Sequence, residues 1–389
     1  MQKPLRVVIA GAGVGGLVAA HELLHRLGDR VHVRILEAAP ALRPKLGAGF
    51  SLSGGLQCLR QIPAIKDRLD DISVKPTTFR TVWEDGTTLA SFSAHDLVGD
   101  PPAFAQFMRD ELQILLYKSL PKGMVECGQR VVSVNQEHRM VLTRKEEIPY
   151  DLLIGADGIK SQIRSELFDK SWDRLYSGLS IYYCVIPDSL VQQYGDFRFQ
   201  EGAITETVGK GSSQISFACG SKREWTFSYS YRSPQPPNAR EWAATDEAIF
   251  EKTNEVTKYA SRAMNFGLYH TPPRSVSWVK DRVVLMGDAA HATTPFMGQG
   301  ANQAIQDATC LARLLAENPS EVDAALAQFY KIREPVTSRI IAASKVAGKL
   351  RTADNIFERA VRHLAYRAMF ANEGAIFKYR FPAETSPVV

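Results

Sequence analysis

The chain has 389 residues, 45% of them hydrophobic and 23% charged, a composition typical of a soluble globular protein with two or three domains. Its 47 basic and 42 acidic residues leave a net charge of only +5, which argues against nucleic acid as a partner. Five scattered cysteines without a CxxC pair argue against disulfides and zinc, so we expect reduced thiols in the cytoplasm. The histidines show no metal-ligand spacing, and no apolar run reaches the roughly 20 residues of a transmembrane segment.

The N-terminal segment predicts a strand, a tight turn and a helix that bind a nucleotide. Apolar residues 7–10 precede GAGVGG, and the following LVAAHELLHRL has helical spacing. In this pattern Gly11 makes the turn, Gly13 lets a diphosphate approach the backbone, and Gly16 lets the helix pack closely on the strand. The diphosphate is expected at the positive end of the helix that begins near Val14.

A second apolar strand, VHVRILEA, carries Glu37 about 20 residues beyond the glycines. A carboxylate there can accept hydrogen bonds from both ribose hydroxyls and repels a 2′-phosphate. These two features predict an ADP-containing cofactor. They do not separate FAD from NAD, because both carry the same ADP half.

A later stretch, GDAAHATTPFMGQGAN, follows the predicted strand 283–286. Asp288 at the strand end can bind a polyhydroxyl chain such as the ribityl linker of a flavin. Pro295 and the loop 298–300 come next, and the loop glycines let backbone N–H groups approach a planar ring. A helix that begins near Ala301 places its positive end at the ring edge and favours a reduced, negatively charged flavin. The alternative is a strand, loop and helix whose glycines serve turn geometry alone.

Together with DLLIGADGIKSQIR at 151–164, these motifs make the chain resemble the class A flavoprotein monooxygenases, the aromatic hydroxylases similar to para-hydroxybenzoate hydroxylase. The resemblance implies that Asp157 and the helix-initiating Arg109 contribute to the FAD site. It also implies that Pro295 and Gly298 lie near the reactive ring edge, and it assigns no catalytic side chain. The predicted cofactor-binding residues are Gly11, Gly13, Gly16, Glu37, Arg109, Asp157, Asp288, Pro295, Gly298, Gly300, Ala301 and Asn302.

The resemblance implies noncovalent FAD, with NADPH or NADH as cosubstrate. In this family O₂ adds at flavin C4a, and the hydroperoxide hydroxylates or epoxidises an aromatic or other electron-rich small molecule. No second GxGxxG is present, which suggests that NAD(P)H binds transiently. The alternative function is an FAD-dependent reductase or dehydrogenase of the isoprenoid-reductase type, without oxygen insertion. The protein is expected to be a monomer or a homodimer.

The predicted fold is α/β, with a Rossmann-like FAD-binding domain, an inserted antiparallel substrate sheet and C-terminal helices. Its predicted parts are an FAD-binding domain of 1–75, 104–168 and 276–317, a substrate domain of 76–103 and 169–275, and a C-terminal helical region with its tail, 318–389.

The inserted segment contains a strand, WTFSYSYRS, that places Trp225, Phe227 and Tyr229 on one face. Two interpretations stay open: an aromatic wall that contacts substrate above the flavin, or packing of the sheet against a helix. A helix is predicted over 241–264. In the C-terminal region, Arg359, Arg362 and Arg367 indicate either a membrane-surface helix or the solvated face of a docked helix.

Overall fold

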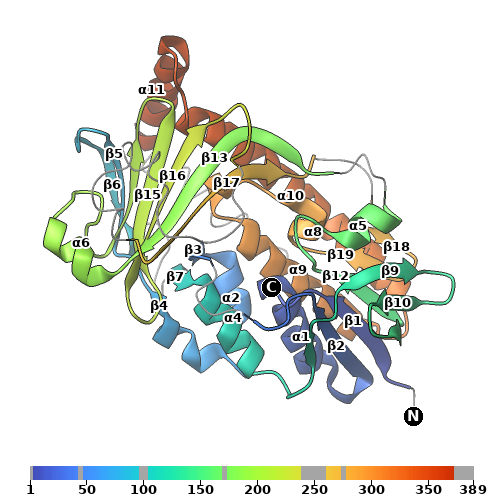
Figure 1. The fold of residues 1–389 in the computed structure, drawn as a ribbon. Helices are drawn as coiled ribbons and strands as arrows, with labels where there is room; N and C mark the ends of the chain where they lie inside the picture. The colour runs from blue at the N-terminus through green and yellow to red at the C-terminus, as the bar shows by residue number, and fades with distance from the viewer. Residues whose placement is uncertain are drawn as a thin grey trace.

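In the computed structural model, the described residues are 3–42, 47–95, 104–168, 173–237, 260–272 and 277–371. They form two large sheets, two small sheets and flanking helices (Figure 1). This arrangement confirms the predicted α/β fold with a parallel sheet, an antiparallel sheet and C-terminal helices. Most of the helix predicted over 241–264 lies outside the described residues, and its last three residues instead begin strand β17 (Arg262–His270).

The first large sheet has the strand order β18-β19-β12-β1-β2-β8, and only β18 runs antiparallel to its neighbour. Its central strands are buried apolar runs, as expected for a parallel sheet covered on both faces. The carboxyl ends of its parallel strands meet at one edge, where ligands of open α/β sheets bind. The strands are β1 (Leu5–Ala10), β2 (Val31–Glu37), β8 (Val125–Cys127), β12 (Leu152–Gly155), β18 (Val279–Lys280) and β19 (Val283–Leu285).

Helices cover this sheet, and two of them, α1 and α9, pack directly on each other (Figure 1). A three-stranded sheet of β9, β10 and β11 leads into β12, and its first two strands confirm the hairpin predicted over 131–143. The helices are α1 (Val14–Leu27), α2 (Gly54–Arg60), α4 (Arg109–Lys118), α5 (Gln162–Leu167), α8 (Asp288–His291), α9 (Gly300–Glu317) and α10 (Val322–Arg351). The small-sheet strands are β9 (Val131–Asn135), β10 (Met140–Thr143) and β11 (Glu147–Pro149).

The second large sheet has the order β17-β13-β16-β15-β14-β5-β6, with one parallel pair, β14 and β5. A smaller sheet of β3, β7 and β4 lies between it and the first sheet (Figure 1). The seven-stranded sheet comprises β5 (Thr78–Trp83), β6 (Thr88–Ser93), β13 (Leu175–Ile186), β14 (Ala203–Val208), β15 (Ser212–Cys219), β16 (Glu224–Arg232) and β17. The smaller sheet comprises β3 (Gly49–Leu52), β4 (Ser73–Val74) and β7 (Ala105–Met108).

The two faces of the seven-stranded sheet have different neighbours. On one face, Thr226 Oγ1 accepts a hydrogen bond from the Gly49 N–H of β3 at 2.7 Å, and we call this the inward face. The other, outward face packs against helix α6 (Asp188–Tyr194) and the loop that follows it. Side chains alternate between faces along a strand, so consecutive residues of β16 belong to different surfaces.

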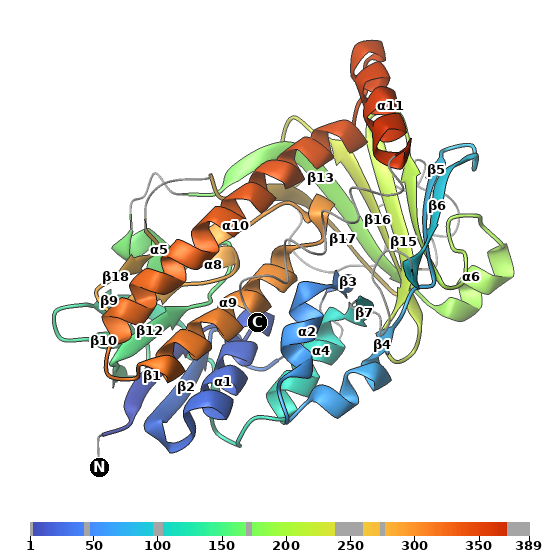
Figure 2. The same cartoon turned by 180° about the vertical axis from the view of Figure 1, so that it is seen from behind.

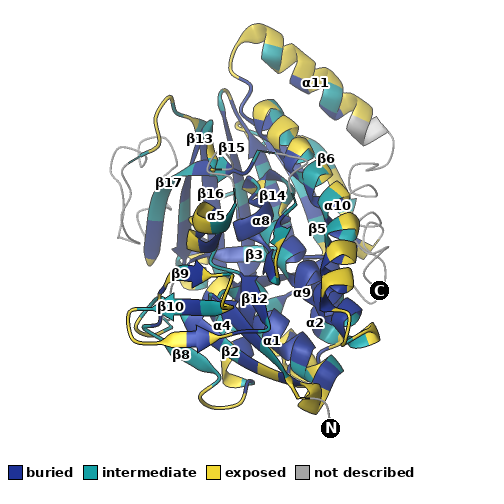
Figure 3. Cartoon of the chain, turned by 90° about the vertical axis from the view of Figure 1, so that its right-hand side faces the viewer, coloured by how far each residue is buried: buried dark blue, intermediate teal, exposed yellow. Residues whose placement is uncertain are grey.

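The long helix α10 runs obliquely across the molecule from beside α9 to the base of α11 (Ile356–Ala371) (Figure 2). Helix α11 is largely exposed (Figure 3), yet Arg362 is buried and donates a hydrogen bond to the Gly209 carbonyl oxygen at 2.7 Å. Arg362 therefore holds the helix on the sheet, whereas Arg359 and Arg367 are exposed, as expected for the solvated face of a docked helix. Among the described residues, no helix is long and apolar enough to cross a membrane.

Candidate active site

The nucleotide loop joins β1 to α1 at the carboxyl edge of the first sheet. A Cβ on Gly16 would lie 2.1 Å from the Gly11 carbonyl oxygen, and a Cβ on Gly11 would lie 2.4 Å from the Ala156 oxygen. Both positions therefore require glycine for close packing. A Cβ on Gly13, by contrast, would meet no atom within 4 Å. Gly13 thus borders open space at the start of α1, where a diphosphate can approach the backbone.

Glu37 ends β2 beside this loop, as the sequence predicts. Its Oε2 accepts a hydrogen bond from the Ala12 N–H at 2.9 Å, and its Oε1 accepts one from the Ala39 N–H at 2.7 Å. The carboxylate therefore holds the glycine loop in place. Because each carboxylate oxygen has a second lone pair, Glu37 can still accept a ligand hydroxyl.

Asp157 and Arg164, from the second motif, fix two turns near the carboxyl edge. Asp157 Oδ2 accepts a hydrogen bond from the Gln162 N–H at 2.8 Å and so holds the start of α5. Arg164 is buried, and its guanidinium donates a hydrogen bond to the Ala289 carbonyl oxygen at 2.8 Å. The second motif, residues 151–164, thereby supports the third motif, residues 287–302.

Asp288 begins α8 directly after β19 and is exposed, although both residues that flank it are buried. Its side chain has no hydrogen-bond partner among the described residues. Desolvation by the surrounding protein raises the pKa of Asp288, and charges on His291, Arg109 and Arg164 oppose that shift. An accessible carboxylate without a protein partner is suited to accept hydrogen bonds from ligand hydroxyls.

Pro295 and Gly298 bound a one-turn 3-10 helix, η6 (Pro295–Met297), and both are exposed. Gly298 has φ +64, and a Cβ there would meet no atom within 4 Å. Helix α9 begins at Gly300, one residue before the predicted Ala301, and both residues are half-buried. The loop therefore presents backbone, rather than side chains, to the space in front of the helix N-terminus.

Asn302 is buried and clamps this loop onto β3 and α2. Its Oδ1 accepts hydrogen bonds from the Ser53 N–H at 2.8 Å and the Gly55 N–H at 3.0 Å. Its Nδ2 donates to the carbonyl oxygens of Gly298 at 2.9 Å and Ser51 at 3.2 Å. These four bonds use both donors and both acceptor positions of the amide, so Asn302 positions the loop rather than a ligand.

Arg109 begins α4, as predicted, and its side chain is exposed. It lies close enough to Asp288 for its charge to lower the pKa of that carboxyl group. The structure therefore brings Arg109 together with the third motif, although 179 residues separate the two in the sequence.

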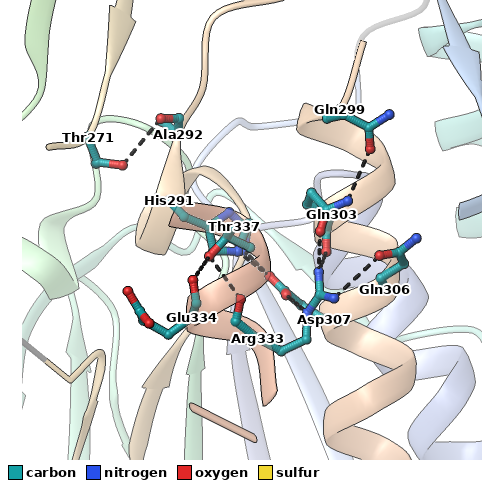
Figure 4. A network of polar contacts seen from close by, with 11 residues as sticks. Thr271, His291, Ala292, Gln299, Gln303, Gln306, Asp307, Arg333, Glu334 and Thr337 are labelled. Atoms are coloured by element: carbon teal, nitrogen blue, oxygen red, sulfur yellow. Dashed lines mark hydrogen bonds and ion pairs between the residues drawn. The ribbon is translucent and has the colours of Figure 1, made fainter. Parts of the chain in front are cut away.

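A buried network of charged and polar residues, which the sequence analysis missed, lies behind the loop (Figure 4). His291 Nε2 lies 2.6 Å from Asp307 Oδ2, which also accepts the Gly287 N–H at 2.8 Å. Arg333 of α10 donates to Asp307 Oδ1 at 2.7 Å, and both side chains are fully buried. Burial raises the pKa of Asp307, but the charges of His291 and Arg333 hold it far below its usual value. The only sign of this network in the sequence is a charged residue, Asp307, within the apolar pattern of α9.

The predicted aromatic wall is not brought to this site. Trp225 and Phe227 pack around Phe199 in a core on the outward face, with ring centroids at 5.5 and 5.9 Å. Trp225 Nε1 donates to Asp188 Oδ1 of α6 at 2.6 Å. Tyr229 belongs to the same core, so the alternative of sheet packing against a helix describes all three residues. The β16 residues on the side of β3 are Thr226 and Ser228, which alternate with these aromatic residues along the strand.

A cavity of about 930 Å³ lies between β13, β17, α10 and α11. It reaches the third motif at Thr294 and Phe296, and its lining includes neither Asp288 nor Gly298. The exposed residues of the third motif are therefore not part of this cavity.

The comparison with protein families gives the class of protein. Residues 4–344 match the FAD-binding domain family, and the chain belongs to this family of FAD-dependent monooxygenases. Among characterised relatives, the chain is 30% identical over 354 residues to 3-amino-4-hydroxybenzoate 2-monooxygenase of Streptomyces cremeus, covering 87% of this chain and 86% of the relative. It is 29% identical over 387 residues to aurachin C monooxygenase/isomerase of Stigmatella aurantiaca, with 95% of each covered.

Solved structures show the same fold. HpxO of Klebsiella pneumoniae, complexed with FAD and uric acid, matches with a TM-score of 0.80 and 20% identity over 97% of each chain. A salicylate hydroxylase substrate complex matches with a TM-score of 0.78 and 22% identity over 100% of this chain and 99% of the other. The open space at Gly13 and Gly298 and the unpartnered Asp288 suit an FAD stretched between the two motifs.

Proposed function

We propose that this enzyme uses NAD(P)H and O₂ to hydroxylate or epoxidise an aromatic or other electron-rich small molecule. The observation that carries the proposal is the set of exposed residues in the third motif, Asp288, Pro295 and Gly298, in a segment whose Phe296 packs on the inward face of the antiparallel sheet. The family match supports the flavin, and the names of the characterised relatives support oxygen transfer to aromatic compounds.

In this proposal the predicted residues hold FAD along the carboxyl edge of the first sheet. Gly11, Gly13 and Gly16 shape the diphosphate loop, and Glu37 holds that loop while accepting ribose hydroxyls. Arg109 and Asp288 bind the ribityl and diphosphate region. When bound, the flavin supplies the redox and oxygen-transfer chemistry, for which protein side chains have no equivalent.

The other residues of the third motif orient the ring and exclude water. The N–H groups around Gly300 and Ala301, at the N-terminus of α9, favour negative charge on the nearby ring edge. Asn302 bonds to both Gly298 and Ser51 of β3, which fixes the loop relative to the strand that contacts the inward face. Precise placement of the reacting groups is worth several orders of magnitude in rate.

We also propose that NAD(P)H binds transiently, and that the FAD-binding and substrate domains have the predicted bounds. The strands of the parallel sheet fall within 1–75, 104–168 and 276–317, and those of the seven-stranded sheet fall within 76–103 and 169–275, which supports this division.

The direct test is oxygen-isotope incorporation. Purified protein is loaded with FAD and incubated with NADPH or NADH, ¹⁸O₂ and candidate phenols, and the products are analysed by mass spectrometry. We expect one labelled oxygen atom per product molecule and NAD(P)H oxidation that is faster with substrate. A reduced or dehydrogenated product without label would instead establish the reductase alternative.

A further inference from the structure

The central part of the inward face lies between two contacts with the FAD-binding segments. On one side, Thr226 accepts the Gly49 N–H of β3. On the other side, Leu179 and Ile181 of β13 pack with Phe296 of the third motif. On β13, β15 and β16 the strand register places five residues between these contacts, and we call them the central patch. The central patch consists of Tyr183, Ser213, Ile215, Ser228 and Ser230.

The central patch offers neutral hydrogen-bonding groups beside apolar surface. The hydroxyls of Ser213, Ser228 and Ser230 have no hydrogen-bond partner within the described ranges. None of the three hydroxyl oxygens is fully buried, so each is accessible to a ligand. Tyr183 donates its hydroxyl proton to the Gly49 carbonyl oxygen at 2.6 Å, which leaves the phenol oxygen free to accept. Ile215 lies next to Ser228 on the same face and supplies apolar contact.

The charged residues around this patch are already compensated. Three arginines on or beside the inward face have a carboxylate partner, in the ion pairs Arg262–Asp110, Arg351–Glu206 and Arg232–Glu358. Glu206 lies beside Ile215 in the strand register, so its carboxylate borders the patch. His270, the last residue of β17, is buried, and desolvation lowers its pKa, which favours the uncharged imidazole.

We propose that the substrate of this enzyme carries no carboxylate. It is an uncharged aromatic or heteroaromatic compound whose hydroxyl, carbonyl or N–H group bonds to Ser228 and its neighbours, while its ring packs on Ile215 and Tyr183. This inference rests on the proposed function and names its substrate class. A carboxylate placed on this patch would lose its hydration, meet arginines that already have a carboxylate partner and lie near Glu206, so its binding is disfavoured.

Matched ligand pairs test the inference on the FAD-loaded protein. Methyl 4-hydroxybenzoate is compared with 4-hydroxybenzoate, and salicylamide with salicylate, at pH 7, where both acids are ionised. Binding is followed by the change in flavin absorbance. We expect the neutral member of each pair to bind about 10-fold more tightly or better. Equal or tighter binding of the acids overturns the proposal, and so does failure of both neutral compounds to bind.

A charge variant tests the cause of this discrimination. Glu206→Gln leaves Arg351 without a charged partner, so we expect acid binding to tighten about 10-fold and neutral binding to change less than about 2-fold. The matched control is Glu201→Gln, because Glu201 is 75% exposed and pairs with Arg223 on the protein surface. Unchanged acid binding in a folded Glu206→Gln protein overturns the charge argument. If that variant does not fold, the ligand pairs on the wild-type protein still decide.

These measurements report binding and not turnover. A neutral compound that binds more tightly than its acid but yields no ¹⁸O-labelled product would contradict the proposed oxygenation and leave the substrate class standing. Labelled product from the acids alone would contradict the substrate class and leave the oxygenation standing.

Discussion

Two carboxylates at the ends of strands of the same parallel sheet differ in their hydrogen-bond partners. Glu37 at the end of β2 binds two backbone N–H groups through its two oxygens. Asp288, after β19, is exposed and its side chain has no hydrogen-bond partner in the described part of the chain. Glu37, which we propose for the adenosine side, is therefore built into the protein, whereas Asp288, which we propose for the flavin side, is available to a ligand.

What supports each carboxylate also differs. Glu37 depends on its own loop, since its partners are Ala12 and Ala39. The turn that carries Asp288 depends on distant elements, through Arg164 of α5 and the buried pair of Asp307 and Arg333. The flavin side should therefore be the more sensitive of the two to substitutions far from the ligand.

The largest expected effect is on stability and follows from removing the buried charge of Asp307, which bonds to the turn that carries Asp288. Asp307→Asn leaves Arg333 buried without a carboxylate partner, and we expect the free energy of unfolding to fall by about 3–5 kcal/mol. Denaturant unfolding followed by fluorescence measures it. The control is Asp323→Asn, whose side chain is 71% exposed and pairs with Arg282, and which should cost less than about 1 kcal/mol.

The pH dependence of this variant gives an independent check. Asp307 has a pKa in the folded state below its unfolded value of about 3.9. Its contribution to stability is therefore complete above about pH 4 and decreases as the pH falls from there toward the folded-state pKa. The difference in stability between wild type and Asp307→Asn should shrink as the pH falls below 4. A difference that grows as the pH falls below 4 would contradict the assignment.

The sequence predicted most of the fold because its signals are local. Glycine spacing and a strand-end carboxylate identified the loops at Gly11 and Gly298, and Arg109 was found through the family resemblance. The buried Asp307 and Arg333 were missed because their pairing depends on α9 packing against α10, which no local pattern encodes. In β16, period-two alternation separated the residues into two faces, but it could not tell which face meets β3.

Removal of the unpartnered carboxylate should weaken FAD binding directly. Asp288→Ala loses a charge-assisted hydrogen bond worth about 1.5–3 kcal/mol, so we expect FAD affinity to fall about 10- to 150-fold. Asp288→Asn is the matched variant, since it keeps the shape and one acceptor and should lose less. Fluorescence titration of the apoprotein with FAD measures both. Wild-type affinity in Asp288→Ala would refute the ribityl role.

Substitution of the exposed loop glycine tests the flavin side without touching a carboxylate. A side chain at φ +64 costs about 1–2 kcal/mol, so Gly298→Ala should shift the loop conformation while leaving room for FAD. We expect flavin reduction by NAD(P)H to slow about 5- to 30-fold and FAD affinity to change less. Stopped-flow absorbance measures the rate with and without substrate, which should accelerate reduction in the wild type. Equal losses of reduction and binding would show that Gly298 serves the loop fold alone.

The smallest effect is expected on the adenosine side. Glu37→Gln keeps one oxygen acceptor but turns an amide N–H toward a backbone N–H, so one of the bonds to Ala12 or Ala39 is lost. A single net hydrogen bond is worth about 0.5–1.5 kcal/mol, which predicts a 2- to 10-fold loss of FAD affinity. Glu126→Gln, on the neighbouring strand β8, should leave FAD affinity unchanged because Glu126 pairs with Arg34. If Glu37→Gln weakened FAD binding more than Asp288→Ala, the glycine loop and not the unpartnered carboxylate would dominate cofactor retention.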